Sequence, residues 1–254
     1  MPPAMSHPLE ELSVVMPVYN EAGTIERVLR ELHAKIAPCV ARLEIVVAED
    51  GSTDGTREIL ARVAPELGIR LVSGPQRKGY TRAVKDALAL ATRPWIFFTD
   101  SDGQQEPDDL FRLAAAVESA HADIATGVKT PRHDPWPRLV LSRGLALANR
   151  AVLGARFRDA NCGFRLMRTA VVAELLPQVN RLPQFVNAEL LLRAWAAGHR
   201  VVEVPVRHYA RTEGGSRGLP PARIPREVAL ALRGLWAMRA ELARPRQTVG
   251  EAAR

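Results

Sequence analysis

"WIFFTDSDGQQEPDDLFRLAAAV", residues 95–117, contains a complete strand–loop–helix unit. The apolar run 95–99 predicts a buried β-strand, because it is rich in aromatic and β-branched residues. An acidic loop follows at once, and Pro107 then stands where proline favours the first turn of a helix. Apolar residues recur beyond it at helical spacing, at Leu110, Leu113, Ala114 and Val117. The stretch predicts one β-α unit whose loop carries carboxylates at the end of the strand.

The same alternation of strands and helices fills the chain before residue 95. The predicted segments, in chain order, are a strand over 12–19, a helix from Gly23, a strand over 43–48, a helix over 57–63, a strand over 69–73 and a helix over 79–91. Nearly continuous apolar strands separated by helices indicate a parallel sheet with helices on both faces. The predicted fold is therefore α/β, and ligands of such sheets bind beyond the carboxyl ends of the strands.

Several classes of protein are excluded by what the sequence lacks. A chain of 254 residues can form one large α/β domain, with or without a short appendage. No run approaches the ~18 apolar residues of a membrane span, and the N-terminus lacks the basic and apolar regions of a secretory signal. Cys39 and Cys162 are far apart, without metal-ligand spacing, which suits a reducing cytoplasm. The strand ends carry neither a dinucleotide-binding glycine fingerprint nor a P-loop.

The net charge of +7 is divided unevenly between the two halves of the chain. Residues 1–128 carry a net charge of −6, whereas residues 129–254 carry +13. Such asymmetry predicts an anionic partner for the second half: a nucleic acid, a membrane surface or a phosphorylated substrate. An Arg-rich composition is the alternative explanation, since only four of the 35 basic residues are Lys. The basic half contains no nucleic-acid-binding motif and little aromatic interleaving, so we expect no nucleic-acid partner.

Polar clusters follow three of the predicted strands, at 17–21, 49–55 and 100–104. Asp100 and Asp102 point the same way, because alternate residues of an extended stretch share a face. Together with Gln104 they predict a site for Mg²⁺ or Mn²⁺, which would bridge to a diphosphate. Gly103 would let the backbone approach closely. Two explanations without a metal stay open: a chance D-x-D, and a helix cap at Asp102.

Longer stretches of the chain resemble a known family. "SVVMPVYNEAGTIERVL", "IVVAEDGSTDGT" and "FFTDSDGQQEP" resemble family 2 glycosyltransferases of the GT-A fold. "PWPRLVLSRGLALANRAVLG", "RDANCGFRLMR" and "FVNAELLLRAWAAGHRVVEVPVRHYARTEGGSR" are similar to the dolichyl- or polyprenyl-phosphate sugar (mannose) synthase branch. The resemblance covers residues 12–218. It implies a GT-A domain with a mostly parallel sheet. It also implies an inverting, metal-dependent enzyme that moves a sugar from a GDP- or UDP-sugar to a polyprenyl or dolichyl phosphate.

The resemblance also implies roles on the donor side. The residues that would line the base and ribose of the nucleotide-sugar are Pro17, Tyr19, Glu21 and Asp50. The family's metal-binding D-x-D-x-Q corresponds to Asp100, Asp102 and Gln104. Basic residues that would close over the donor diphosphate are Arg211 and Arg217. The sequence departs from the pattern at Glu49, where Asp is usual, and at Gly103, where Leu is usual.

On the acceptor side, Lys129, Arg138 and Ser142 match residues that hold the acceptor's phosphate. With Asp102 and Arg211, Arg138 would form the catalytic set. Lys129 stands where Arg is usual, which keeps the charge but loses the bidentate fork. Glu189 is followed by Leu190 rather than by a second acid, which favours a phosphate acceptor. Two alternatives stay open: transfer to a saccharide or small-molecule hydroxyl with Glu189 as base, and a non-catalytic binding subunit.

The C-terminal part predicts an amphipathic helix over 219–244. Its apolar residues at helical spacing are Val228, Leu232, Leu235 and Trp236, with Arg226, Arg233, Arg239 and Arg244 interspersed. The helix could pack on the domain, or lie on an anionic membrane surface. We expect disorder over 1–11 and 245–254. We also expect a cytoplasmic protein, peripheral at the inner face of the membrane or attached to a membrane partner.

Overall fold

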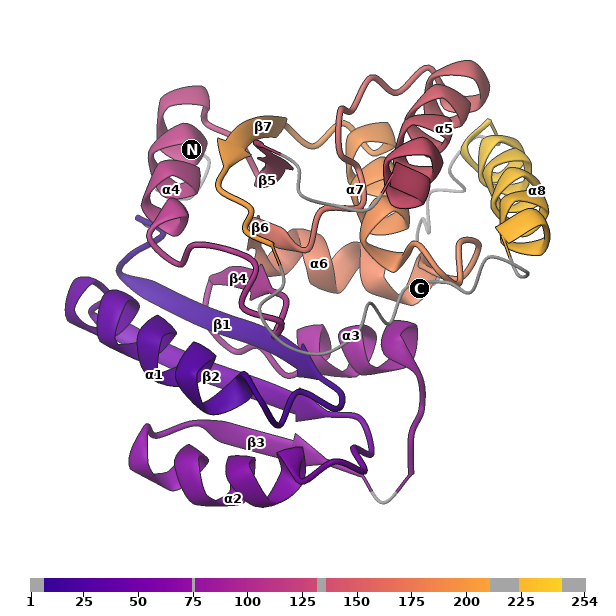
Figure 1. Ribbon diagram of the computed structural model, residues 1–254. Coiled ribbons are helices and arrows are strands. Elements are labelled where there is room, and N and C mark those ends of the chain that lie inside the picture. Colours follow the sequence, from indigo (N-terminus) through magenta and orange to yellow (C-terminus); the bar gives the residue numbers. More distant parts are fainter. Residues whose placement is uncertain (1–6, 75, 132–135, 211–223, 244–254) are drawn as a thin grey trace, which may run out of the picture.

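The computed structural model describes residues 7–74, 76–131, 136–210 and 224–243, and of residues 136–140 the backbone alone. Its centre is a seven-stranded sheet of order β3-β2-β1-β4-β6-β5-β7 (Figure 1). The strands are β1 Glu11–Val18, β2 Arg42–Glu49, β3 Arg70–Ser73, β4 Trp95–Thr99, β5 Ile124–Lys129, β6 Phe164–Arg168 and β7 Val201–Val206. The strands predicted in the first half are all present, and β4 has the predicted bounds.

All strand pairs are parallel except those that β6 makes. It runs antiparallel to β4 on one side and to β5 on the other. The remaining strands therefore point in one direction, and their carboxyl ends meet at one edge of the sheet. Because β6 is reversed, its first residue lies at that same edge. The predicted parallel sheet is thus confirmed for most strands, with β6 as the exception.

Helices cover both faces of the sheet, as predicted (Figure 1). On one face lie α1 Ile25–Ile36, α2 Thr56–Glu66 and α4 Asp109–Ala120. On the other face lie α3 Tyr80–Ala89, α6 Thr169–Leu175 and α7 Val186–Ala196. Short 3₁₀ helices, η1 Ala37–Cys39 and η2 Leu176–Gln178, follow α1 and α6. Successive side chains of a strand enter opposite cores: Phe97 packs with the first group of helices and Phe98 with the second.

A third, smaller core joins the C-terminal helix to the domain. Helix α5, Trp136–Leu153, lies beside α8, Ile224–Leu242 (Figure 1). Apolar side chains from α5, α7, α8 and the segment before α7 meet there: Val152, Leu182, Leu192, Ala231, Leu235 and Met238. Of the predicted apolar stripe, Leu235 is buried, whereas Val228, Leu232 and Trp236 are exposed. Helix α8 therefore packs on the domain and still presents apolar side chains to solvent.

The segment 1–11 was predicted to be disordered, but residues 9–11 are ordered in the structure. Strand β1 begins at Glu11, and the carbonyl oxygens of Leu9 and Glu10 accept hydrogen bonds from Ala41 and Arg42, at 3.1 and 2.9 Å. Leu9 packs against the first core. Burial of one apolar side chain and two backbone hydrogen bonds order this end of the segment. In the part of the chain that the structure describes, no helix is long and apolar enough to cross a bilayer.

The close contact of α8 with the domain depends on Gly234. A Cβ at this position would overlap with the carbonyl oxygen of Arg181 and lie 2.7 Å from Cδ2 of Leu182. Gly144 in α5 is also a helix glycine, but a Cβ there would meet no atom within 4 Å. We expect Gly234→Ala to lower the free energy of unfolding by about 1–3 kcal/mol through overpacking.

Gly144→Ala is the matched control, and should raise that free energy by about 0.5–1 kcal/mol, because alanine favours the helix. Urea unfolding curves measure both changes. A stabilised Gly234→Ala variant would show that α8 does not pack this closely.

Candidate active site

The loops after β1 and β2 are joined by hydrogen bonds at the carboxyl edge of the sheet. The backbone N–H of Asn20 donates to Ser52 Oγ at 2.8 Å, and that of Thr53 donates to Asn20 Oδ1 at 2.7 Å. The backbone N–H of Glu21 donates to Thr56 Oγ1 at 2.8 Å. The predicted nucleotide-binding clusters 17–21 and 49–55 therefore form one structural unit.

Asp50 draws a third loop into this unit. Its carboxylate is almost fully buried, and its two oxygens accept the backbone N–H groups of Lys78 and Gly79, at 2.6 and 2.9 Å. The guanidinium of Arg77 consequently lies 4.0 Å from the centre of the Tyr19 ring, in a cation–π contact. Tyr19 and Asp50 are thus joined through the loop that carries Arg77, Lys78 and Gly79. Arg77 is not among the residues predicted from the sequence, although the stretch "QRKGY" also follows a strand and carries the same signal as the three clusters.

Glu49, the other acid of the pair, has a structural role. Its side chain accepts a hydrogen bond from the backbone N–H of Ser52, and its Oε2 lies 3.1 Å from Nη2 of Arg57. Arg57 in turn donates to the carbonyl oxygen of Gly74 at 2.7 Å. The side chain of Glu49 therefore holds the loops together and is neutralised within the protein.

The D-x-D loop is fixed by backbone contacts. The backbone N–H of Gln104 donates to Asp102 Oδ1 at 3.2 Å, and Gly103 has a φ of 67°, which glycine adopts without penalty. The side-chain amide of Gln104 donates to the carbonyl oxygen of Tyr209 at 2.9 Å, and the N–H of Tyr209 returns a bond to the Gln104 carbonyl at 2.8 Å. Gln104 therefore fastens the segment after β7 to this loop.

Asp100 is enclosed on two sides. The register pairs Thr99 with Phe164, so Gly163 lies directly beside Asp100. A Cβ on Gly163 would overlap with the carboxylate of Asp100. On another side, the hydroxyl of Tyr80 lies 3.3 Å from Asp100 Oδ1. Desolvation, together with the charge of Asp100, raises the pKa of Tyr80 well above its usual value, so the phenol stays protonated.

These side chains fit a hard divalent cation. Carboxylate oxygens of Asp100 and Asp102 and the amide oxygen of Gln104 are the ligand types that Mg²⁺ and Mn²⁺ prefer. Among the described residues, no three His, Cys, Asp or Glu side chains form a metal-binding cluster. A cation at this loop would therefore complete its coordination with water and with a diphosphate, as it does in sites that bind the metal together with its substrate.

The predicted acceptor residues are only partly described. Lys129 ends β5 at the carboxyl edge, and Ser142 lies in α5; both are partly buried. The backbone of Arg138 is in the first turn of α5, one turn before Ser142, so the two positions share a face of the helix. The side chain of Arg138 lies outside the described part of the structure, and so do Arg211 and Arg217.

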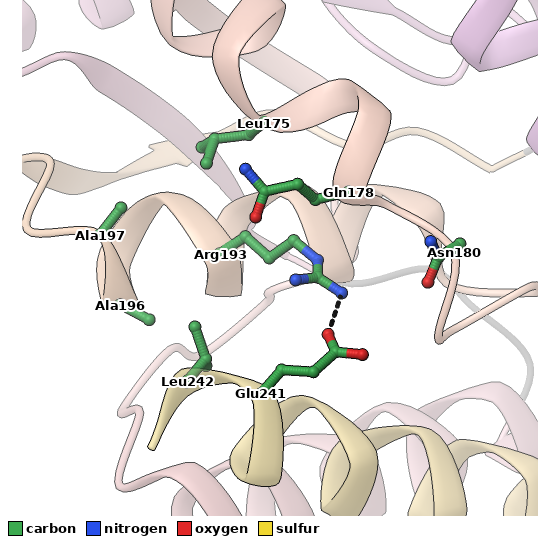
Figure 2. A pocket seen from close by; sticks show the side chains of 8 residues that line it. All are labelled: Leu175, Gln178, Asn180, Arg193, Ala196, Ala197, Glu241 and Leu242. Carbon is green, nitrogen blue, oxygen red and sulfur yellow. Dashed lines mark hydrogen bonds and ion pairs between the residues drawn. The ribbon is translucent and has the colours of Figure 1, made fainter. Parts of the chain in front are cut away.

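Glu189, the predicted alternative base, is fully buried in a structural network. Its Oε1 accepts the N–H of Asn180 at 2.9 Å, and its Oε2 accepts those of Arg181 and Leu182, both at 2.7 Å. Nε of Arg193 donates to Oε1 at 2.9 Å. Nη2 of the same arginine lies 3.1 Å from Oε2 of Glu241 in α8 (Figure 2). Four donors saturate this carboxylate. The geometry therefore contradicts the prediction of Glu189 as a base, and the network instead borders a cleft of about 400 Å³ between α7 and α8.

A family profile decides the classification of the chain. The family described as glycosyl transferase family 2 matches residues 13–176, a span that includes the loops after β1, β2, β3 and β4. The chain belongs to this family. The expected family is thereby confirmed.

Three curated relatives are similar over most of this chain. Polyprenol monophosphomannose synthase of Mycolicibacterium smegmatis is 31% identical over 233 residues, which cover 85% of this chain and 83% of the relative. Glycosyltransferase AglD of Haloferax volcanii is 35% identical over 204 residues, covering 77% of this chain but 32% of AglD. Undecaprenyl-phosphate 4-deoxy-4-formamido-L-arabinose transferase of Edwardsiella ictaluri is 28% identical, covering 82% of this chain and 63% of the relative. Two of the three thus extend well beyond the matched region. Two of the three names, those of the mannose synthase and the arabinose transferase, support the polyprenyl-phosphate sugar transferase branch of the family.

Solved structures confirm the predicted GT-A fold. Glucosyl-3-phosphoglycerate synthase of Mycobacterium tuberculosis in complex with phosphoglyceric acid superposes with a TM-score of 0.68 at 21% identity, covering 91% of this chain and 80% of that one. The same enzyme with Mn²⁺, UDP and glucosyl-3-phosphoglycerate gives 0.68 at 22% identity. At such identities the likeness concerns the fold.

The network around Glu189 predicts that this residue matters for stability and not for chemistry. Glu189→Gln leaves Arg193 without its full counter-charge, so we expect the free energy of unfolding to fall by about 3 kcal/mol or more. Below its melting temperature the variant should keep kcat within a few-fold of the wild type. Urea unfolding and steady-state kinetics test this pair of expectations.

The control is Glu241→Gln, because Glu241 contacts the same arginine but is partly exposed. It should be less destabilising than Glu189→Gln. A stable Glu189→Gln variant whose kcat falls a hundredfold would restore the role of general base, which contributes about 10²–10⁴-fold.

Proposed function

We propose that this protein transfers one sugar from a nucleotide-sugar, a GDP- or UDP-sugar, to a polyprenyl or dolichyl phosphate, with inversion at the sugar. The observation that carries the proposal is the D-x-D loop, placed beside the loops of Tyr19 and Asp50 at the carboxyl edge of the sheet. The 31% identity to a polyprenol monophosphomannose synthase over most of both chains supports this acceptor class. A non-catalytic binding subunit would not require the carboxylates of Asp100 and Asp102 to be held in place by Tyr80 and by the backbone of Gln104.

On the donor side, each group of residues has a distinct task. The nucleotide lies against the unit formed by Pro17, Tyr19, Glu21 and Asp50. The ligands of Mg²⁺ or Mn²⁺ are Asp100, Asp102 and Gln104. Bound there, the metal supplies positive charge that stabilises the departing diphosphate. Arg211 and Arg217 follow the segment that Gln104 fastens, and their charges close over the same diphosphate.

On the acceptor side, the chemistry favours a phosphate. A phosphate monoester is already anionic near neutral pH, since its second pKa is about 6, so it needs little help from a base. Saturation of Glu189 by four donors agrees with this, because a hydroxyl acceptor would need one. Lys129, Arg138 and Ser142 hold the phosphate, and Asp102, Arg138 and Arg211 form the catalytic set.

The test of the acceptor is a substitution that affects one substrate only. Arg138→Ala removes charge-assisted hydrogen bonds to the phosphate, each contributing about 1.5–3 kcal/mol. We expect acceptor kcat/KM to fall ten- to several-hundredfold at about 1.4 kcal/mol per decade. Donor-nucleotide affinity, measured by calorimetry with metal present, should stay within a few-fold of the wild type. A screen of nucleotide-sugars against a polyprenyl phosphate, read by product mass, identifies the sugar.

The control substrate is the free polyprenol, which lacks the phosphate and should be a poor acceptor. If the polyprenol or a saccharide hydroxyl is the better acceptor, or if Arg138→Ala leaves acceptor kinetics unchanged, the lipid-phosphate assignment is wrong. Transfer to a hydroxyl would then replace it.

We also propose that the protein is cytoplasmic and binds the inner face of the membrane, where a lipid phosphate resides. Helix α8 supports this location. Val228, Leu232 and Trp236 follow one another at intervals of four residues, and the Trp236 side chain is 59% exposed. The exposed residues Arg226, Arg233 and Arg239 lie among them. An apolar row with interspersed cations is typical of a helix that lies in the headgroup region of an anionic bilayer.

Vesicle sedimentation tests this attachment. Each Arg near an anionic surface contributes about 1 kcal/mol, so we expect Arg226→Gln with Arg233→Gln to weaken binding to anionic vesicles about ten- to thirtyfold. The matched control is Arg30→Gln with Arg62→Gln on α1 and α2, which removes the same charge and should have little effect. Binding should also weaken with salt. Equal binding to neutral and anionic vesicles would contradict an electrostatic attachment.

A further inference from the structure

The hydroxyl of Tyr80 connects two parts of the chain at the D-x-D loop. Tyr80 is the first residue of α3, and its side chain is 44% exposed. Its hydroxyl lies 3.3 Å from Asp100 Oδ1 and 3.0 Å from Nδ2 of Asn187 in α7. A solvent-facing tyrosine thus directs its polar end inward, between a carboxylate and a buried amide.

The direction of these hydrogen bonds follows from the chemistry of the three groups. The NH₂ of Asn187 can only donate, so the phenol oxygen accepts this bond. A phenol has a single hydrogen, which is then left for Asp100. The carboxylate oxygen can only accept. Asn187 therefore orients the hydroxyl, and the hydroxyl donates to Asp100.

Asn187 is itself held in place. It is 3% exposed in the first turn of α7, and its carbonyl oxygen accepts a hydrogen bond from the buried guanidinium of Arg165. Helix α3 is joined to the segment before α7 as well. Lys85 donates to the carbonyl oxygen of Val179 at 2.8 Å, and Thr81 donates to that of Pro183. The distance between Tyr80 and Asn187 is therefore set by several independent contacts.

We propose that Tyr80 is a positioning residue, which Asn187 orients and which fixes the carboxylate of Asp100 for binding the metal ion. The proposal rests on the proposed function in one respect, that Asp100 is a metal ligand. Gly163 leaves no space on another side of the carboxylate, so the bond from Tyr80 selects one orientation of those that remain.

The expected effect is on metal affinity. Residues that hold a metal-binding carboxylate by a hydrogen bond usually change metal affinity or activity 10- to 100-fold when they are removed. The bond to Tyr80 is long, so we expect the lower end of this range. Tyr80→Phe removes the hydroxyl and keeps the ring. Asn187→Leu removes the amide that orients it, and should produce a smaller effect in the same direction.

The experiment measures binding of Mn²⁺ to the whole chain by electron paramagnetic resonance, alone and with GDP or UDP. We expect Tyr80→Phe to raise the Kd for Mn²⁺ about tenfold. Nucleotide affinity without metal, measured by calorimetry, and the melting temperature should both stay close to the wild type. A role in folding alone would change the melting temperature and leave the Kd for Mn²⁺ unaffected.

Tyr209→Phe is the matched control. Tyr209 is 45% exposed, and its hydroxyl also lies 3.3 Å from a carboxylate, that of Glu106, which is not a predicted ligand. The Tyr209→Phe variant should bind Mn²⁺ with the same Kd as the wild type. Asp102→Asn is the positive control and should lose most Mn²⁺ binding.

The outcomes separate the two proposals. If the wild type binds Mn²⁺ and Tyr80→Phe binds it equally well, the role of Tyr80 is wrong while the proposed function stands. The same conclusion holds if Tyr80→Phe and Tyr209→Phe weaken binding to the same extent. If the wild type binds no Mn²⁺ with either nucleotide, the metal-dependent function itself fails.

Discussion

The reversed strand β6 brings the second half of the chain into the site. Its pairing with β4 sets Phe164 opposite Thr99, and this register places Gly163 against the carboxylate of Asp100. A shift of one residue would turn the side chains of β6 to the opposite faces of the sheet and put a side chain where only glycine fits. The same strand carries Arg165, whose guanidinium is buried behind the site and holds the start of α7. The position of Asp100 and that of α7 therefore follow from one strand pairing.

The acidic first half of the chain contains carboxylates of two kinds. Glu49 and Asp109 are buried and neutralised by arginines, Arg57 and Arg207, with ion-pair distances of 3.1 and 2.9 Å. Burial raises the pKa of Asp109, but the hydrogen bonds and charge of Arg207 outweigh it, so the net pKa is lowered. These acids hold loops. Asp100 instead accepts a hydrogen bond from a neutral group, the hydroxyl of Tyr80. The negative net charge of the first half therefore includes acids, such as Glu49 and Asp109, that are paired with arginines and do not contribute to a cation site.

Local patterns predicted the elements whose causes are local. The bounds of β4 and the buried face of α1, with Ile25, Leu29 and Leu32, follow from apolar periodicity within a few residues. The contact of Asn187 with Tyr80 joins residues 107 positions apart, and no periodicity contains it. Glu189 was misread for a related reason, because its donors come from backbone groups that carry no sequence signal. In α8 the large residues suggested the buried face. Of these only Leu235 is buried, and the helix packs through it together with Met238 and with the small residues Ala231 and Gly234, which allow a close approach.

Helix α7 links the surface of the molecule to the site. Its first turn supplies Asn187, and less than two turns later Arg193 contacts Glu241 of α8. Nearly every residue between these two positions is buried, so the helix cannot rotate or slide without disturbing the core of the domain. The ion pair of Glu189 and Arg193 costs desolvation, and a buried pair of this kind is weak evidence for stability by itself. Its three additional backbone hydrogen bonds give it a different value, because they fix the rotation of α7 against the segment 180–182. The rotation of α7 sets the direction of the Asn187 amide, and through Tyr80 that of the Asp100 carboxylate.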